Sequence, residues 1–378
     1  MMSIDPIQLT QDLVRCESVT PEDDGAQQVL IDAVLPMGFT AEKLPFAEVE
    51  NVFARLGTDG PHFCYAGHTD VVPPGDLAAW THPPFAAEIH DGILYGRGTS
   101  DMKGGNACFV AAVSRFLEKH GAPDGSISLL ITGDEEGPAV NGTVKVLEWM
   151  AAQGQIPDHC LVGESSNSTQ HGEEIKVGRR GSLNGEIIVR GKQGHVAYQH
   201  LADNPVPKLA ALVSVLSSYE FDQGNDHFLP TNLEVTTFDV GNPTANVIPA
   251  TAKAAFNVRF NDLWTAKTLA EKITALLDET GIDYDISYAS NAESFITQPG
   301  AFTDLVAGAV QDVCGRKPAL TTKGGTSDAR FISRYCPVVE YGVTNETIHQ
   351  VDENATIADL EMLTDIYLRV LEQYFGKN

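Results

Sequence analysis

Residues 126–137 read SISLLITGDEEG, a mostly apolar run that ends in three consecutive acids, Asp134, Glu135 and Glu136. A short apolar run followed by Gly and charged residues predicts a buried strand. Carboxylates held side by side at the end of such a strand repel one another, which is costly unless a cation or a proton offsets their charge. The stretch therefore predicts a buried sheet with an acidic functional loop at one strand end. A solvated acidic turn is the alternative.

The chain on either side of this stretch has the pattern of an α/β fold. Residues 62–66 and 160–162 are further short apolar runs that end near a glycine. Segments with helical periodicity lie between these runs, which favours helices flanking a mostly parallel sheet. The predicted helices of this part are residues 6–16, 24–37, 104–120 and 139–153.

A different pattern begins near residue 183. The predicted order is strand, helix, strand, strand, helix, strand, which is the ferredoxin-like arrangement. These elements are residues 183–190, 205–221, 232–240, 252–260, 265–280 and 283–289. The α/β pattern then resumes, with helices at 301–314, 327–335 and 357–375 and a strand at 338–343. We therefore expect one α/β domain, residues 1–180 and 294–378, that is interrupted by an inserted α+β domain, residues 181–293.

The composition limits the partners of the chain. Its 378 residues include 25 Lys and Arg against 51 Asp and Glu, for a formal net charge of −26. A field of that sign repels phosphate backbones and anionic lipid. The sequence contains no long apolar run, its start lacks the pattern of a secretory leader, and its six cysteines form no Cys-x-x-Cys pair. We expect a cytoplasmic protein that binds neither nucleic acid nor a membrane.

Two segments near predicted strands carry side chains that can bind a metal. His68 and Asp70 share one face of an extended segment, so one can ligate an ion while the other supports it. Asp101 lies in a glycine-rich loop, GRGTSDMKGG at 96–105, and stands where the dinucleotide fingerprint needs its third glycine. Taken alone, the first pair also fits incidental polar surface, and Asp101 also fits a helix N-cap.

Glu164 and His349 repeat the pattern of a ligand type after a predicted strand. Ligands of open α/β sheets bind at the carboxyl ends of the strands. We therefore expect six side chains to converge there, namely His68, Asp101, Glu135, Glu136, Glu164 and His349. Two histidines and several carboxylates suit Zn²⁺ first, and Mn²⁺ or Co²⁺ next. Two such ions bridged by a carboxylate polarise a carbonyl and activate water, so the pattern favours hydrolysis.

Other chemistries lack their motifs in this sequence. There is no Gly-x-Ser-x-Gly elbow, no Walker loop and no His-Glu-x-x-His helix. We interpret Ser327, in GGTSD at 324–328, as part of the first turn of a helix, whose free N–H groups can bind a substrate carboxylate.

Over essentially its whole length the chain resembles the co-catalytic zinc amidohydrolases of the aminoacylase and carboxypeptidase family. The motifs that carry the resemblance are GHTDVVP at 67–73, GTSDMKG at 98–104, TGDEEG at 132–137, VGESS at 162–166, GRRGS at 178–182, GKQGHVAY at 191–198, GGTSDAR at 324–330 and TIH at 347–349. The resemblance implies a zinc-peptidase-like catalytic domain and an inserted domain that serves as dimerisation and lid domain.

The resemblance also implies roles for the candidate residues. Two Zn²⁺ are expected per subunit, with Co²⁺ or Mn²⁺ as alternatives at one position. One ion is held by His68, Asp101 and Glu164, and the other by Asp101, Glu136 and His349, so that Asp101 bridges them. Asp70 orients His68, and Glu135 is the general base that takes a proton from water and passes it to the departing amine.

The same resemblance implies a homodimer formed through the inserted domain, in which His195 stabilises the oxyanion in the site of the neighbouring subunit. The expected substrate is an anionic acyl-amino acid, N-succinyl-LL-2,6-diaminopimelate of lysine and diaminopimelate biosynthesis. The expected substrate-binding residues are Arg179, Ser182, Tyr198, Asn246, Arg259, Gly325, Thr326 and Asn345. A related deacylase acting on acetylornithine, a metallodipeptidase, and a non-catalytic metal-binding protein on the same fold are the alternatives.

Overall fold

The computed structural model describes residues 3–377 and divides into two compact units. The α/β unit comprises residues 1–177, 297–321 and 327–378, and the inserted unit comprises 178–296 and 322–326. The boundaries at 177/178 and 296/297 each lie three residues from the boundary expected from the sequence, whereas the sequence pattern predicts residues 322–326 in the α/β domain. Residues 322–326 belong to the inserted unit because Thr322 Oγ1 donates to the His227 carbonyl at 2.6 Å and Arg179 donates to the Lys323 carbonyl at 3.0 Å.

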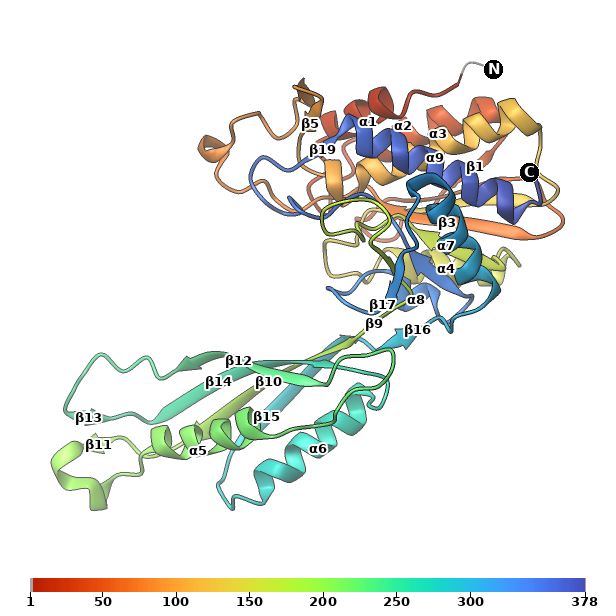
Figure 1. Cartoon of the computed structure of the whole chain (residues 1–378). Coiled ribbons are helices and arrows are strands. Elements are labelled where there is room, and N and C mark those ends of the chain that lie inside the picture. Colours follow the sequence, from red (N-terminus) through yellow and green to blue (C-terminus); the bar gives the residue numbers. More distant parts are fainter. Residues whose placement is uncertain (1–2, 378) are drawn as a thin grey trace. The chain divides into compact units, whose positions relative to one another are not determined.

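The α/β unit is built on an eight-stranded sheet, drawn in Figure 1. Its order is β1 (Thr40–Lys43), β2 (Asn51–Leu56), β6 (Ser126–Thr132), β3 (His62–His68), β7 (His159–Val162), β18 (Val338–Glu340), β8 (Glu174–Lys176) and β17 (Ala319–Thr321). The four central strands from β6 to β18 run parallel, while β1, β2 and β8 join antiparallel. The expected mostly parallel sheet is confirmed. A second, three-stranded sheet has the order β19 (Asn354–Thr356), β5 (Ile93–Tyr95) and β4 (Glu88–His90).

The helices of this unit are α1 (Pro6–Arg15), α2 (Ala26–Val34), α3 (Gly104–His120), α4 (Thr143–Ala152), α7 (Ala301–Cys314), α8 (Ala329–Ile332) and α9 (Ile357–Tyr374). Helix α3 packs against β3, α1 and α9, and Tyr65 of β3 stacks on Phe109 of α3 with ring centroids 4.2 Å apart. Since α3 is buried along its first three turns, this contact fixes the position of β3 in the core.

Three of these helices are clearly shorter than expected. Helix α8 spans only Ala329–Ile332 of the predicted 327–335, so Ser327 precedes the helix, and its hydroxyl donates to Glu340 Oε1 at 2.5 Å. The other two are shortened for local reasons. Helix α2 ends at Val34 and gives way to a 3-10 turn over Leu35–Met37, since Pro36 has no N–H to continue an α-helix. Helix α4 begins at Thr143 because the N–H groups of Val140 and Asn141 donate to the Asp134 carboxylate, at 2.8 and 2.9 Å.

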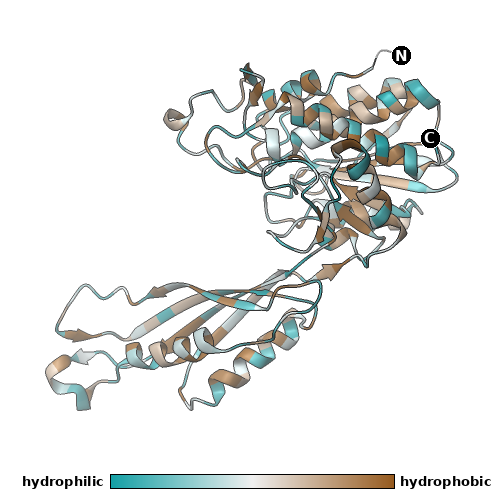
Figure 2. Ribbon diagram, viewed as in Figure 1, coloured by the Kyte–Doolittle hydropathy of each residue, from teal (hydrophilic) through white to brown (hydrophobic). Residues whose placement is uncertain are grey.

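The inserted unit has the expected ferredoxin-like arrangement. Its strands β10 (Gly181–Arg190), β12 (Asn232–Asp239), β14 (Thr251–Phe260) and β15 (Asp285–Ala292) form an antiparallel sheet in the order β12, β14, β10, β15. Helices α5 (Pro205–Ser218) and α6 (Ala266–Asp278) bury their apolar faces against this sheet. Figure 2 shows hydrophobic and hydrophilic residues alternating along both helices, as expected for helices with one face on a core.

Two small ladders mark the two ends of the inserted unit. β9 (Gly178–Arg179) pairs with β16 (Phe295–Ile296) at one end, and β11 (Gly194–His195) pairs with β13 (Val247–Ile248) at the other, as Figure 1 shows. Among residues 3–377, no helix combines the length and the apolar character that a membrane crossing needs.

Candidate metal centre

Three neighbouring parallel strands deliver ligand-type side chains to one edge of the central sheet. His68 is the last residue of β3, Glu135 and Glu136 follow β6, and Glu164 follows β7. The carboxyl ends of parallel strands share one edge, so residues almost a hundred positions apart in the sequence come together there. Asp101 reaches the same place from the loop before α3, and His349 from the segment after β18.

Asp101 lies between the two histidines. Its Oδ1 is 3.1 Å from His68 Nε2, and its Oδ2 is 3.1 Å from His349 Nε2. His68 Nε2 is also 3.6 Å from Glu164 Oε1, and His349 Nε2 is 2.8 Å from Glu136 Oε1. The His68, Asp101 and Glu164 side chains are buried, whereas that of His349 is 46% exposed. The five side chains thus form two overlapping sets that share Asp101.

The residues around His68 fix the direction of its ring. Nδ1 lies 2.9 Å from the backbone carbonyl of Asp70, and Asn106 Nδ2 donates to the His68 carbonyl at 2.7 Å. Nδ1 therefore donates its proton to that carbonyl, which leaves the Nε2 lone pair directed at the acids. The Asp70 carboxylate is farther from Nδ1, at 3.7 Å, and instead accepts the N–H groups of Glu135 and Glu136 at 3.3 and 3.0 Å. Asp70 thereby also orients the acidic loop.

The electrostatics of the cluster favour a bound cation. Burial, together with the charge of Glu164, raises the pKa of Glu135 well above its ordinary value. Burial and the charge of Asp101 raise the pKa of Glu164 to about 7. Burial alone would also raise the pKa of Asp101, but hydrogen bonds from His349 and His68 lower it. Divalent cations would compensate this excess of buried negative charge, and imidazole nitrogens with carboxylate oxygens are donors that Zn²⁺ accepts. The residues present therefore fit a pair of such ions.

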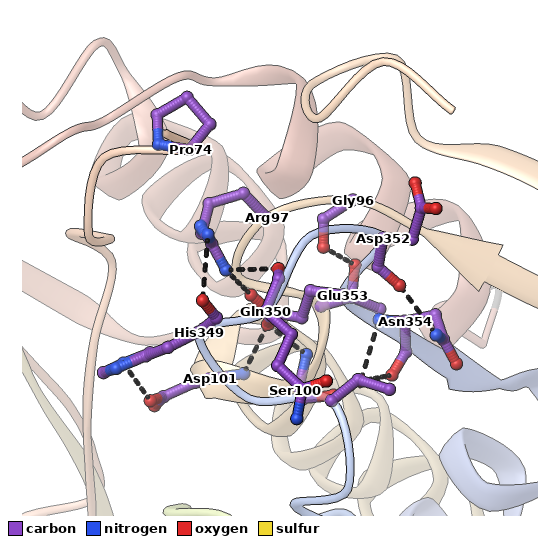
Figure 3. Close-up of polar contacts among 12 residues, drawn as sticks. Pro74, Gly96, Arg97, Ser100, Asp101, His349, Gln350, Asp352, Glu353 and Asn354 are labelled. Carbon is purple, nitrogen blue, oxygen red and sulfur yellow. Dashed lines mark hydrogen bonds and ion pairs between the residues drawn. The ribbon is translucent and has the colours of Figure 1, made fainter. Parts of the chain in front are cut away.

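A buried ion pair behind the cluster holds the Asp101 loop, as Figure 3 shows. Arg97 Nη1 donates to Glu353 Oε2 at 2.6 Å, and both side chains are almost fully buried. The other oxygen of Glu353 accepts the backbone N–H groups of Ser100 and Asp101 at 2.9 and 3.1 Å. Arg97 also donates to the His349 carbonyl at 3.5 Å. One carboxylate therefore ties together the segments that carry Asp101 and His349.

We expect the Glu353→Gln substitution to reduce metal affinity or turnover about ten- to a hundredfold, since loss of a group that orients metal ligands costs about that much. The neutral amide leaves the buried Arg97 charge without its partner and supplies only one acceptor oxygen. Metal content and steady-state rate, measured together, check this. Glu361→Gln, which removes a half-exposed partner of Arg115, is the matched control and should change neither by more than about twofold. Equal behaviour of the two variants would contradict this role of Glu353.

The other predicted site residues lie mostly in the inserted unit. His195 and Tyr198 are exposed at the end of β11, and Asn246 lies opposite, where its carbonyl accepts the Val196 N–H at 3.1 Å. Ser182 and Arg259 face each other in the register of β10 and β14, and Arg179 lies in β9. Gly325 and Thr326 also belong to this unit, whereas Asn345 belongs to the α/β unit, where its N–H donates to the Asn167 carbonyl at 2.8 Å.

Sequence reasoning missed three residues that support the cluster, namely Arg97, Asn106 and Glu353. Arg97 stands four residues before Asp101, and Glu353 four residues after His349. The available signal was therefore a pair of opposite charges, each at the same spacing from a predicted ligand. Asp134, the first acid of the acidic loop, does not join the cluster, because its carboxylate is engaged by Val140 and Asn141.

Comparison with known proteins shows similarity over almost the whole chain. The profile of peptidase family M20/M25/M40 matches residues 64–373. A succinyl-diaminopimelate desuccinylase of Rhodospirillum centenum is 56% identical over 380 residues, covering 99% of this chain and 98% of that protein. A protein of the same name from Rhodopseudomonas palustris is 55% identical, with 98% of each chain covered.

Solved structures share the fold at low sequence identity. An M20 family metallo-carboxypeptidase from Sulfolobus solfataricus has a TM-score of 0.82 at 18% identity, covering 98% of this chain and 99% of the other. A dinuclear metal-binding peptidase of the M20 family from Bacillus subtilis has a TM-score of 0.75 at 16% identity, covering 99% and 98%. These likenesses confirm the expected architecture.

Proposed function

Since the chain belongs to peptidase family M20/M25/M40, we propose that it hydrolyses N-succinyl-LL-2,6-diaminopimelate to succinate and LL-2,6-diaminopimelate in lysine and diaminopimelate biosynthesis. The chain is a hydrolase of this family. The observation that carries the substrate assignment is the identity of 55–56% to curated succinyl-diaminopimelate desuccinylases over nearly the full length of both chains.

We propose that the centre holds two Zn²⁺, with Co²⁺ or Mn²⁺ as alternative occupants of one position. His68, Asp101 and Glu164 would hold one ion, and Asp101, Glu136 and His349 the other. The proposal is supported by Asp101, whose two oxygens each lie 3.1 Å from a different histidine. When bound, such a pair of ions polarises the substrate carbonyl and lowers the pKa of water.

Glu135 acts as the proton carrier of the reaction. Burial and the charge of Glu164 raise its pKa well above the ordinary value, which suits a carboxylate that must accept a proton from water. As water oxygen attacks the amide carbon, the carboxylate takes a proton from that water. It then donates that proton to the amide nitrogen as the C–N bond breaks. The products are the amine and a new carboxyl group on succinate, whose remaining proton passes to the amine or to solvent.

His195 is proposed to donate a hydrogen bond to the developing oxyanion. Its Nδ1 accepts the N–H of Ala197 at 3.1 Å, so the proton of the neutral ring resides on Nε2. A preorganised N–H donor of this kind stabilises the negative charge that appears on the carbonyl oxygen in the transition state.

The inserted unit supports the proposal that two chains build each site. Ser182 and Arg190 lie at opposite ends of β10, and eight residues of strand extend about 26 Å. Arg179, Ser182 and Arg259 therefore lie at the end of the unit that carries β9. His195, Tyr198 and Asn246 lie beyond the other end, near β11 and β13. Figure 1 shows β9 and these two strands at opposite ends of the unit. A single small substrate cannot reach both groups within one chain. A second copy would supply the group that is missing.

Exposed apolar side chains next to His195 suit this dimer. Val196, Tyr198 and Leu201 are 47%, 57% and 59% exposed in one short 3-10 segment, Val196–Leu201. Large apolar side chains that gather in this way mark a surface that another protein covers.

A mixed dimer tests whether His195 acts across subunits. Glu135→Gln and His195→Ala homodimers should each be nearly inactive. A heterodimer of the two variants, purified with two different tags, should regain half of the wild-type rate, since one site then combines an intact Glu135 with the partner's intact His195.

The control for this experiment pairs wild type with the double variant that carries Glu135→Gln and His195→Ala. If His195 acts across subunits, this heterodimer has no complete site and should be nearly inactive. The reverse pattern, an inactive first heterodimer and a half-active control, would place His195 in the site of its own chain.

Recognition of the substrate is proposed to rest on two arginines and a set of polar groups. Arginine binds a carboxylate in a bidentate geometry that Lys cannot reproduce, and it offsets locally the repulsion from a net charge of −26. Arg179 and Arg259 would bind carboxylates of the anionic substrate. The polar partners would be Ser182, Tyr198, Asn246, Gly325, Thr326 and Asn345.

Steady-state kinetics on two substrates tests the assignment. We expect kcat/KM for N-succinyl-LL-2,6-diaminopimelate to exceed that for N-acetylornithine by about a hundredfold or more, because a site built to bind several carboxylates leaves its polar groups unpaired with the smaller ligand. A preference for N-acetylornithine would instead assign the chain to the acetylornithine deacetylases.

The cellular location is proposed to be the cytoplasm. All six cysteines are free thiols, which is compatible with a reducing compartment.

The strong net negative charge disfavours nucleic acid as a partner.

A further inference from the structure

A second group of metal-binding side chains lies on the α/β unit, formed by His82, Glu88 and His90. His82 Nδ1 is 3.1 Å and His90 Nε2 is 3.0 Å from the same oxygen, Glu88 Oε2. Three ligand atoms, one from each residue, lie within 4.8 Å of one another. Neither the proposed reaction nor the residues that support the catalytic cluster use any of the three.

The fold holds these side chains close together. Glu88 and His90 are two residues apart on the edge strand β4, so both point to the same face of the three-stranded sheet. The His82 ring stacks on His90 and packs at a tilt against Tyr95 of the neighbouring strand β5, with ring centroids 4.3 and 4.2 Å apart. The backbone N–H groups of Thr81 and His82 donate to the Asp352 carboxylate at 2.8 and 3.3 Å. Strand β4 therefore positions Glu88 and His90, while ring packing and the hydrogen bonds to Asp352 position His82.

We propose that His82, Glu88 and His90 form a binding site for a further divalent transition-metal ion, with Zn²⁺ as the expected occupant. Two imidazole nitrogens and one carboxylate oxygen are donors that Zn²⁺ prefers, and three protein ligands leave a fourth position for water. The side chains of Glu88 and His90 are 43% and 51% exposed, so an ion can enter from solvent.

The three side chains would have to move little to bind an ion, because each histidine nitrogen is already about as far from the Glu88 oxygen as two ligand atoms are around Zn²⁺. Ligand atoms about 2.0–2.1 Å from a tetrahedral Zn²⁺ are separated by about 3.3 Å. The two His-to-Glu88 distances, 3.0 and 3.1 Å, are already close to that value. Both imidazoles approach the same carboxylate oxygen, Glu88 Oε2, and a cation can take the place of the protons at that point.

Metal counting on the intact protein tests the site. Wild type, His90→Ala and Glu88→Gln would be dialysed against the same micromolar concentration of free Zn²⁺, and bound zinc would be measured by mass spectrometry. We expect each variant to bind one Zn²⁺ fewer per chain than wild type. Glu88→Gln keeps the shape of the side chain and so guards against an effect of misfolding. His227→Ala, which removes an exposed histidine of the inserted unit, is the control and should bind as wild type does.

The outcome does not depend on the proposed reaction, because the measurement counts bound metal and not turnover. A deficit of one Zn²⁺ in both variants, with unchanged hydrolytic rate, supports a site separate from the catalytic centre. Equal zinc content in wild type and both variants would overturn the proposal and leave the three residues as a hydrogen-bonded cluster.

Discussion

The Glu135→Gln substitution should lower kcat by about a thousandfold or more while both cations stay bound. General acid–base catalysis by a placed side chain contributes about a hundred- to ten-thousandfold, and Glu135 is proposed to serve both proton transfers of the reaction. An amide of the same shape cannot take up the proton. The backbone N–H of Glu135, which donates to Asp70, is unchanged by the substitution, so the acidic loop should keep its position.

The neighbouring acid provides the control for this prediction. Glu136 Oε1 lies 2.8 Å from His349 Nε2 and is proposed as a metal ligand, so Glu136→Gln should lower the metal content as well as the rate. Metal analysis and kcat measured on both variants separate the two roles. Retention of more than about a tenth of the wild-type kcat by Glu135→Gln would show that another group moves the proton.

The site residues that could be predicted from the sequence are those that lie at the ends of strands. Each of His68, Glu136 and Glu164 follows a short apolar run in the sequence, and the parallel pairing of β6, β3 and β7 brings their ends together. The ferredoxin-like order of the inserted unit was also predictable, because its long strands and helices show clear periodicity in the sequence.

The remaining features depend on long-range contacts that leave no local pattern. Arg97 and Glu353 are 256 residues apart, and only the folded chain shows that this pair holds the Asp101 loop. The group of His82, Glu88 and His90 arises because a loop packs its histidine ring onto an edge strand. Asp134 is the opposite case. Its position in a run of acids suggested a functional role, but its carboxylate accepts the N–H groups of Val140 and Asn141 in the loop before α4.

Asp101→Ala is expected to abolish both activity and metal binding at the catalytic centre. Asp101 is the one residue proposed to contact both cations, and each of its oxygens faces a different histidine. Polarisation by the metals contributes several kcal/mol to transition-state stabilisation, so its loss should lower the rate by about a thousandfold or more. The backbone N–H of residue 101 can still donate to Glu353, and the loop should therefore fold as in wild type. Asp226→Ala, which removes an exposed carboxylate of the inserted unit, should behave as wild type.

Dependence of the reaction on two cations is tested most directly by adding Zn²⁺ to the chelated protein while the rate on N-succinyl-LL-2,6-diaminopimelate and the bound metal are followed together. The His90→Ala background removes the additional site from the count. There, activity should be absent at the start and return as zinc binds, reaching its maximum at two ions per chain, and the same protein with Asp101→Ala should show no such rise. Full activity in the chelated protein, or an equal rise with Asp101→Ala, would contradict a reaction that depends on two cations held by these side chains.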